Sequence, residues 1–426
     1  MRKLSLLLTS LSLAACGSGN VIHVDPSSDD QTAIQTAFVD VEDDMVIELG
    51  AGTYTLTDAL ELSNHSGVTL RGAGMGQTTL DFSGQVTGGA GVDMMNMTNV
   101  LVEGLTILDA AGNGLRISNS EGVVIRGVSA GWTAEDSVDN GKYAIYPVSS
   151  QHVLIEDCEA FNSADAGLYV GQVQTCIVRN SRAHGNVAGI EIENSTDCEV
   201  YGNTAEDNTG GILVFELPTL PRRGGGTLVT DNMIRNNNRV NFGDPTTTVG
   251  LVPAGSGLFI LAANDVEISN NTIEGNRGVA STVISYQIIS ALTGEAPPDD
   301  PGYDPYSEGI YIHDNTYSGN GDMPGSMTPD GSNDALRTLL GLMAAAGTTL
   351  TTVEEITWDG FLADGSTPAD VLCAQNNAGA EFRLLDLPGL LGDGLMTNTD
   401  ITPHDCMGTP RPRVDEAFAG FAALED

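Results

Sequence analysis

The chain has 426 residues, of which 57 are acidic and 17 basic, giving a formal net charge of −40. A surface this negative repels the phosphate backbone, so composition excludes nucleic acid as a partner. The acidic residues are spread along the whole sequence, which indicates a solvated surface rather than an acidic tail.

Residues 1–15 have the pattern of a secretory signal peptide. Arg2 and Lys3 precede an apolar stretch over residues 4–13, and small residues lead to Cys16. The segment Leu13-Ala14-Ala15-Cys16 resembles a bacterial lipobox. This resemblance implies that Cys16 is lipidated and anchors the protein to a membrane, and Gly17 in place of Asp implies the outer membrane, on either its periplasmic or its cell-surface side. The alternative is an ordinary signal peptide followed by a chance cysteine.

Residues 16–66 are expected to form a tether, a capping helix and the first strands. If residues 30–39 are helical, Ala33, Ile34, Ala37 and Phe38 fall on one face and can cover an open end of the fold. The apolar alternation over residues 46–49 and 52–56 predicts the first strands.

Three stretches, residues 153–170, 176–192 and 198–214, repeat one pattern. Each contains a short apolar alternation, a small turn, an alanine and a Gly-aliphatic-x-aliphatic strand that begins at Gly167, Gly189 or Gly211. A period of 22 or 23 residues made of short strands and turns predicts stacked coils rather than a closed globule. We therefore expect an all-β solenoid of about nine coils over residues 67–321. A leucine-rich repeat is disfavoured because these coils use Val, Ile and Gly instead of its leucine signature.

One position of the repeat is a corner between strands. Asparagine tolerates a left-handed backbone, and stacked amides can hydrogen-bond along the rod. This corner carries Asn203, Asn232, Asn271 and Asn315, with Ser181 and Cys158 in two earlier coils.

Four long insertions interrupt the period, at residues 131–143, 217–226, 236–255 and 277–308. All but residues 217–226 are expected between the asparagine corner and the glycine strand, so they should form a wall along one edge. Residues 322–426 lack the coil pattern and are expected to form an irregular C-terminal cap, with a helix over residues 335–346.

Export permits disulfides. Cys373 and Cys406 both lie in the expected cap and are predicted to pair. Cys176 and Cys198 occupy equivalent positions one coil apart, where parallel Cβ vectors favour two stacked buried thiols over a bridge. Cys158 is predicted to be a buried free thiol.

Two outward columns of the glycine strands bring possible functional side chains together. One column includes Tyr146, Tyr169 and Glu191, and the next includes Glu193 and Phe215. Aromatic rings that stack on sugars beside carboxylates that bind hydroxyls are typical of a carbohydrate site. Glu191 and Glu193, two residues apart on a strand, could also form an acid/base pair or a Ca²⁺ site. The alternatives are an ordinary exposed sheet face and a solvated acidic patch, and no other cofactor is expected.

Residues 165–172, 186–194 and the stretch from Trp358 to Cys406 resemble a family of bacterial parallel β-helix repeat lipoproteins. The wider resemblance is to the right-handed parallel β-helix superfamily, which includes pectate lyases and alginate C5-epimerases. It implies an exported right-handed β-helix. The epimerase motif Asp-Pro-His-Asp has only a partial counterpart at residues 402–405, which lie outside the coils and lack the first Asp.

Three functions remain open. The first is polysaccharide binding by a lipid-anchored β-helix on the face of Tyr146, Tyr169, Glu191, Glu193 and Phe215. The second is a polysaccharide lyase or uronate C5-epimerase, with Tyr169 as base and either Arg179 or a Ca²⁺ at Glu191 and Glu193 neutralising the substrate carboxylate. The third is a non-catalytic envelope lipoprotein whose insertions dock another protein.

Overall fold

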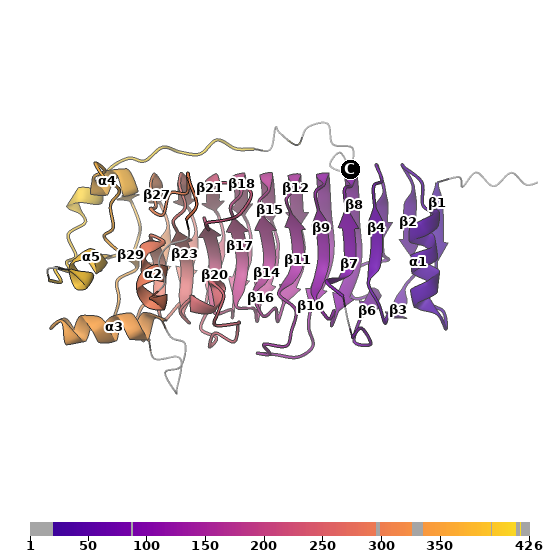
Figure 1. The fold of residues 1–426 in the computed structure, drawn as a ribbon, viewed down its shortest axis with the longest axis horizontal. Coiled ribbons are helices and arrows are strands. Elements are labelled where there is room, and N and C mark those ends of the chain that lie inside the picture. Colours follow the sequence, from indigo (N-terminus) through magenta and orange to yellow (C-terminus); the bar gives the residue numbers. More distant parts are fainter. Residues whose placement is uncertain are drawn as a thin grey trace, which may run out of the picture.

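Alternating apolar side chains give this chain short strands, and the strands of successive coils pair in parallel to build a rod (Figure 1). The computed structural model describes residues 20–86, 88–294, 299–325, 335–392, 394–414 and residue 418. The predicted signal peptide and Cys16 lie outside these residues. Within them, no helix is long and apolar enough to cross a membrane.

Two sheets run along the rod. Sheet A has 20 strands and sheet B has 11. Sheet A comprises β1 (Val21–Val24), β2 (Val46–Leu49), β3 (Gly52–Thr55), β5 (Thr69–Arg71), β6 (Thr78–Asp81), β8 (Thr98–Leu108), β10 (Glu121–Gly131), β12 (Gln151–Glu156), β13 (Glu159–Phe161), β15 (Gln174–Arg179), β16 (Arg182–His184), β18 (Thr196–Tyr201), β19 (Thr204–Glu206), β21 (Gly225–Thr230), β22 (Met233–Arg235), β24 (Val266–Ser269), β25 (Thr272–Glu274), β27 (Ile310–His313), β28 (Thr316–Ser318) and β30 (Leu372–Gln375). Sheet B comprises β4 (Leu60–Ser63), β7 (Ala90–Met95), β9 (Asn113–Ser118), β11 (Tyr143–Val148), β14 (Ala166–Gly171), β17 (Ala188–Glu193), β20 (Gly210–Phe215), β23 (Ser256–Leu261), β26 (Val279–Ile284), β29 (Ile356–Trp358) and β31 (Phe382–Leu384).

The stack is longer than the nine coils predicted, since sheet B alone has 11 strands. The extra coils lie at the two ends. At the start, β1 pairs with β2 before residue 67, and at the end β29, β30 and β31 continue both sheets beyond residue 321. β2 and β3 match the predicted first strands, and Asn377 after β30 continues the asparagine corner. β29 and β31 were missed because they lack the glycine-aliphatic start of the other sheet B strands, yet β29 still supplies buried side chains such as Ile356 and Trp358.

Equivalent positions lie directly against one another, as the repeat predicts. Cys176 pairs with Cys198 between β15 and β18. The expectation of two free thiols is wrong, because these residues form a disulfide with a Cα–Cα distance of 4.4 Å. The close approach of adjacent parallel strands brings the sulfurs within bonding reach despite the parallel Cβ vectors. The predicted Cys373–Cys406 disulfide is present, and Cys158 is a buried free thiol.

The predicted asparagine corner forms a ladder of buried amides. Asn203 Nδ2 donates to Asn232 Oδ1 at 3.0 Å, and the same contact repeats from Asn232 to Asn271 and from Asn271 to Asn315. A second ladder, absent from the sequence-based expectations, joins the five residues Asn186, Asn208, Asn237, Asn276 and Asn320. Both ladders satisfy corner carbonyls that would otherwise be buried without partners.

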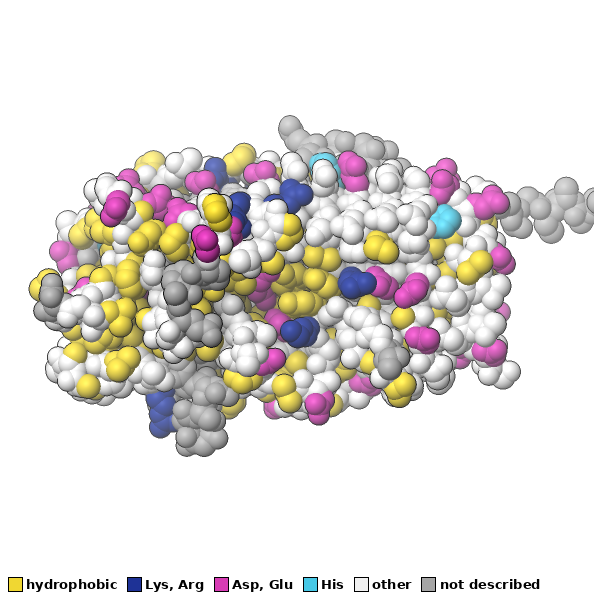
Figure 2. Space-filling view, viewed as in Figure 1, with side chains coloured by type: hydrophobic (Ala, Val, Ile, Leu, Met, Phe, Trp, Pro, Cys, Tyr) yellow, Lys and Arg dark blue, Asp and Glu magenta, His cyan; other side chains and the backbone are white. Residues whose placement is uncertain are grey.

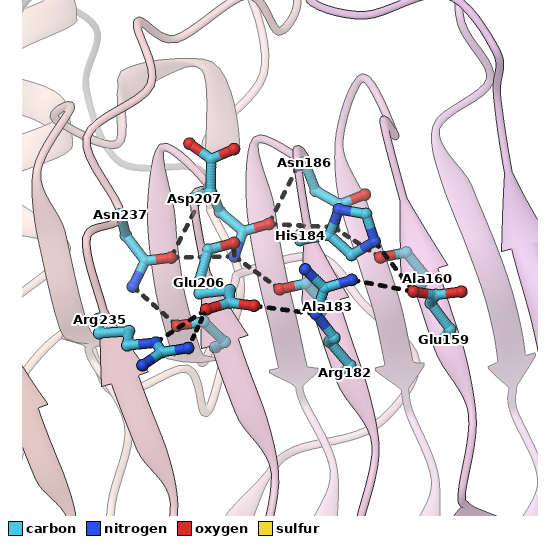
Figure 3. A network of polar contacts seen from close by, with 12 residues as sticks. Glu159, Ala160, Arg182, Ala183, His184, Asn186, Glu206, Asp207, Arg235 and Asn237 are labelled. Carbon is cyan, nitrogen blue, oxygen red and sulfur yellow. Dashed lines mark hydrogen bonds and ion pairs between the residues drawn. The ribbon is translucent and has the colours of Figure 1, made fainter.

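The outside of sheet A carries alternating charges, drawn beside the second ladder in Figure 3. Arg182 bonds Glu159 at 3.0 Å in the preceding coil and Glu206 at 2.9 Å in the next, and Arg235 bonds Glu206 from the other side. Arginines placed between glutamates reduce the repulsion between stacked carboxylates in this acidic chain.

Helices cover the ends of the rod. α1 (Asp30–Asp40) buries Ile34, Ala37 and Phe38 and covers the N-terminal coils, as predicted. The C-terminal part adds α3 (Ala335–Ala345), α4 (Pro368–Val371), α5 (Leu387–Leu391) and the 3₁₀ turn η2 (Thr402–His404).

Insertions flank both edges of sheet B. Residues 131–143 and 236–255 precede strands β11 and β23, as expected. The expectation for residues 277–308 is wrong: β26 lies inside that range, so the insertion that carries α2 (Gln287–Thr293) follows a sheet B strand. It therefore leaves from the same edge as residues 217–226, which lie between β20 and β21. The unusual sequence of β26, which lacks the glycine-aliphatic start, hid this strand.

The C-terminal segment turns back along the outside of sheet A (Figure 1). Cys406 is bonded to Cys373, and further along Arg413 pairs with the buried Glu199 at 2.7 Å. Phe418 then packs on Leu154, Ile177 and neighbouring apolar side chains. We call residues 407–414 with Phe418 the C-terminal strap. It covers an outward apolar column that would otherwise face solvent.

Candidate functional site

The glycine strands of sheet B place the predicted residues in the expected columns. Tyr169 of β14 lies against Glu191 of β17, and Gly171 lies against Glu193. Glu193 in turn lies against Phe215 of β20. On the other side, Tyr146 of β11 pairs with Arg116 of β9. The stacked register thus confirms that these residues share one face.

This face is not the open, flat surface that the sequence suggested. Tyr169, Glu191 and Glu193 are only 3%, 2% and 8% exposed, and Phe215 is buried as well. The insertions at both edges fold over β17 and β20, while Tyr146 and Tyr143 on β11 stay half-buried. The accessible part of the site is therefore a hollow between the insertions rather than a long face.

The hollow is a cavity of about 260 Å³, which we call the acidic cavity. Its floor includes Glu191 and Glu193, and its walls come from insertions on both edges of sheet B. Lys142 is exposed at its rim. Figure 2 shows hydrophobic and acidic side chains gathered in the middle of this face. The lining is Lys142, Tyr143, Asp165, Glu191, Glu193, Leu217, Pro218, Leu220, Thr247, Thr248 and Val249.

The carboxylates of the cavity differ in their partners. Tyr169 Oη donates to Glu193 Oε1 at 2.5 Å, and Gln172 Nε2 donates to the same oxygen at 3.2 Å. Glu191 Oε2 is buried, and no hydrogen-bond partner lies against it among the described residues. A buried polar atom without a partner is costly unless a ligand or a proton satisfies it.

The acidic groups have raised pKa values. Burial raises the pKa of Asp165 to about 8, although the positive charge of Lys142 opposes the shift. Burial, reinforced by the charges of Asp165 and Glu193, raises the pKa of Glu191 well above its usual range. Burial also raises the pKa of Glu193 against the hydrogen bonds from Tyr169 and Gln172. Protonated carboxyls can donate as well as accept hydrogen bonds at neutral pH.

Three tyrosines cluster beside the site, and one of them, Tyr143, lines the cavity. The ring of Tyr143 lies 4.2 Å from that of Tyr169 and 4.6 Å from that of Tyr146, measured between centroids. Burial raises the pKa of Tyr169 well above its usual value, and the neighbouring Glu193 adds to the shift. The Tyr169 hydroxyl is therefore a proton donor to Glu193 at neutral pH.

The remaining predicted residues lie elsewhere. Arg179 is on sheet A, where it bonds Glu156 and Tyr201, so the structure does not bring it to Tyr169. Phe215 packs edge to face on Phe259, with centroids 6.0 Å apart. Like Tyr146 and Tyr169, it is not part of the cavity lining. Within the described ranges, no group of three or more His, Cys, Asp or Glu side chains could hold a metal ion. A Ca²⁺ at Glu191 and Glu193 stays a prediction.

Sequence reasoning missed three members of the site. Lys142 and Asp165 each come directly before a sheet B strand, and Tyr143 begins one. Lys142 had a usable signal, because the sequence contains only two lysines. Asp165 had none, since aspartate is common at turns between coils.

The match to a known family agrees with the fold. Residues 122–293 match the family described as the right handed beta helix region. No curated protein sequence matches this chain significantly.

Among solved structures, the chain is similar to the A-module of the mannuronan C-5 epimerase AlgE6 from Azotobacter vinelandii. The identity is 19%, over 69% of this chain and 86% of that chain, with a TM-score of 0.43. It is also similar to the pectate lyase Pel9A, with 13% identity over 84% and 76% of the two chains and a TM-score of 0.44. An alginate lyase from a Paenibacillus species is similar at 12% identity, over 71% and 95%, with a TM-score of 0.34. By its stacked parallel sheets and the match over residues 122–293, the chain has the fold of a right-handed parallel β-helix protein.

Proposed function

We propose that this protein binds a polysaccharide or another glycan at the acidic cavity. The observation that carries the proposal is Glu191, a buried carboxyl with an unpartnered oxygen, on the floor of a cavity beside half-buried tyrosine rings. A sugar offers hydroxyls for such a carboxyl and a CH face for an aromatic ring. Tyr143, which lines the cavity, would stack on the sugar, and Lys142 would contact the ligand at the rim.

The test is retention of the full chain on immobilised polysaccharides or a glycan array. Glu191→Gln and Tyr143→Ala should each lower affinity about tenfold or more, because a buried hydrogen bond or a stacked ring is worth about 1–2 kcal/mol. Glu61→Gln is the matched control. Glu61 lies on the same outward column, against Asp93 at the N-terminal end, but it is exposed and outside the cavity. Failure of every polysaccharide to retain the protein, or equal retention of all variants, would contradict the proposal.

A lyase or epimerase is the second candidate, and the Tyr169–Glu193 hydrogen bond favours it. A short contact between a phenol and a carboxyl of raised pKa is a route for proton transfer. In this version Glu193 or Asp165 would exchange a proton with a uronate ring, and Lys142 would neutralise the substrate carboxylate. Tyr169 would relay the proton rather than act as a base, since its own pKa is raised. Absorbance at the unsaturated-product band on alginate and pectate, and proton exchange at C5 by NMR, distinguish the two chemistries from binding alone.

We further propose export and lipid anchoring through Cys16. The pattern of residues 1–16 supports this, and so do two disulfides, which persist in oxidising compartments. Labelling with a radioactive fatty acid should mark the wild-type chain and not Cys16→Ser. Labelling of both would contradict the anchor.

A further inference from the structure

A second cavity lies next to the acidic cavity on the outer face of sheet B. We call it the apolar cavity. It has a volume of about 60 Å³ and lies between β23, β26 and the helices α2 and α3. Aliphatic and aromatic side chains line it almost completely, including Phe259, Leu261, Ile284, Ile288 and Leu339. Figure 2 shows hydrophobic side chains gathered over this C-terminal part of the face.

The two cavities follow one another along the same outward columns. Glu191 lies against Leu213, which lies against Phe259 of the apolar cavity. The neighbouring column continues from Glu193 through Phe215 to Leu261 in the same way. Two coil steps therefore separate the acidic floor from the apolar one, which is about 10 Å at the spacing of paired strands.

One residue lines both spaces. Thr248, beside the 3₁₀ turn η1 (Val249–Leu251), contributes to the wall of the acidic cavity and to that of the apolar cavity. The insertion of residues 236–255 therefore borders both cavities. A ligand with a polar and an apolar end could occupy both.

The volume of the apolar cavity limits the size of the apolar group that a ligand can place there. A single water needs about 10–15 Å³ of such space, so the apolar cavity has room for about four or five groups of that size. Water gains little there, because it would find almost no hydrogen-bond partner. A short alkyl or acyl chain fills the space without that penalty.

We propose, on the basis of the function proposed above, that the ligand is a glycan bearing a short acyl or alkyl substituent. The sugar occupies the acidic cavity, and the substituent, of about four or five carbons, enters the apolar cavity past Thr248. Neither a bare polysaccharide nor a free lipid satisfies both spaces.

The experiment measures the affinity of methyl, propyl, pentyl and octyl β-D-glucosides for the full chain carrying Cys16→Ser, by titration calorimetry. Affinity should rise about fourfold for each added methylene up to pentyl and level off at octyl, because each buried CH₂ contributes about 0.8 kcal/mol. Leu339→Trp, which fills the apolar cavity, should abolish the gain with chain length while leaving the methyl glucoside unaffected. Leu342→Trp is the matched control, since Leu342 lies on the same helix but is 49% exposed.

Ile288→Phe on α2 fills the cavity from the opposite wall and serves if Leu339→Trp does not fold. Equal affinities across the series would overturn the inference, and so would a chain-length gain that both filling variants retain. Glu191→Gln separates this inference from the proposed function. It should lower the affinity for all four glucosides by the same factor. If affinity is undiminished and still rises with chain length, the apolar cavity binds alkyl chains independently of the sugar, which contradicts an acylated glycan as the ligand.

Discussion

Tyr169 Oη donates a hydrogen bond of 2.5 Å to Glu193 Oε1, and both side chains are buried on the outer face of sheet B. The two residues come from adjacent coils, 24 positions apart in the sequence. The hydrogen bond stabilises the charged form of Glu193 and so limits the rise in its pKa that burial causes.

Replacing Tyr169 with Phe removes this donor and leaves only Gln172 on the same oxygen. The pKa of Glu193 should rise further, and the free energy of unfolding should fall by about 1–3 kcal/mol, because a buried carboxyl loses a partner. NMR titration of the glutamate side chains and chemical denaturation measure the two effects. Tyr146→Phe is the control, since its ring belongs to the same cluster but its hydroxyl donates no hydrogen bond to Glu193 among the described residues. Equal effects of both variants would contradict the assigned role.

The buried acids predict a pH dependence of stability. The pKa of Asp165 is about 8 in the folded protein, against about 4 in an unfolded chain. Between these values the folded state holds a proton that the unfolded state has released, so stability falls as pH rises through this window. The slope from this group is at most about 1.4 kcal/mol per pH unit, and Glu216, with a pKa of about 7, acts in the same direction.

Asp165→Asn should flatten this dependence between about pH 5 and pH 8, measured by denaturation at constant ionic strength. Glu156 provides the contrast. Burial would raise its pKa, but hydrogen bonds from Arg126 and Arg179 outweigh burial and lower it. Glu156 therefore stabilises the folded state at neutral pH, and this stabilisation is lost as the pH falls. Glu156→Gln should change the pH dependence of stability mainly at acid pH. An unchanged profile in Asp165→Asn would be evidence against a buried neutral carboxyl.

The loss of stability on replacing a ladder asparagine should depend on where that asparagine lies in the ladder. Asn232 is buried and exchanges hydrogen bonds with Asn203, Asn271 and the carbonyl of Val200. Asn232→Ala should lower the free energy of unfolding by about 3 kcal/mol or more, because several buried groups lose partners at once. Asn377 is the half-exposed last amide of the same ladder, so Asn377→Ala should lower the free energy of unfolding clearly less. Similar losses at both positions, in thermal or chemical unfolding, would mean that the ladder does not carry stability.

The C-terminal strap predicts a local effect. Phe418 packs on Leu101, Val124, Leu154 and Ile177. Phe418→Ala should cost roughly 2 kcal/mol of local stability, and hydrogen exchange over residues 407–414 should speed up while the coils stay protected. Met407→Ala is the control, because Met407 is 79% exposed. Unchanged exchange in Phe418→Ala would show that this ring does not hold the strap.

The repeat made much of this fold predictable. Positions such as Tyr169 and Glu191 follow from a period of 22 or 23 residues and the two-residue alternation of a strand, both of which are local properties. The burial of those same residues was not predictable, because it depends on where long insertions fold. The second asparagine ladder was predictable in principle, because Asn208, Asn237 and Asn276 are 29 and 39 positions apart, the same spacing as Asn203, Asn232 and Asn271 of the predicted ladder.

The strap and the Cys176–Cys198 bridge depend on contacts that no short pattern encodes. Arg413 and Val414 both contact Glu199, which lies more than 200 positions earlier in the sequence. The bridge depends on the 4.4 Å distance between the Cα atoms of Cys176 and Cys198 in adjacent coils. The sequence alone does not determine that distance.

The most direct test of a glycan site in the acidic cavity is a crystal structure with a bound oligosaccharide taken from the array. We expect a sugar ring against Tyr143, with a hydroxyl bonded to Glu191 Oε2. A ligand bound only on sheet A or at an end of the rod, with this cavity holding nothing but solvent, would contradict the assignment.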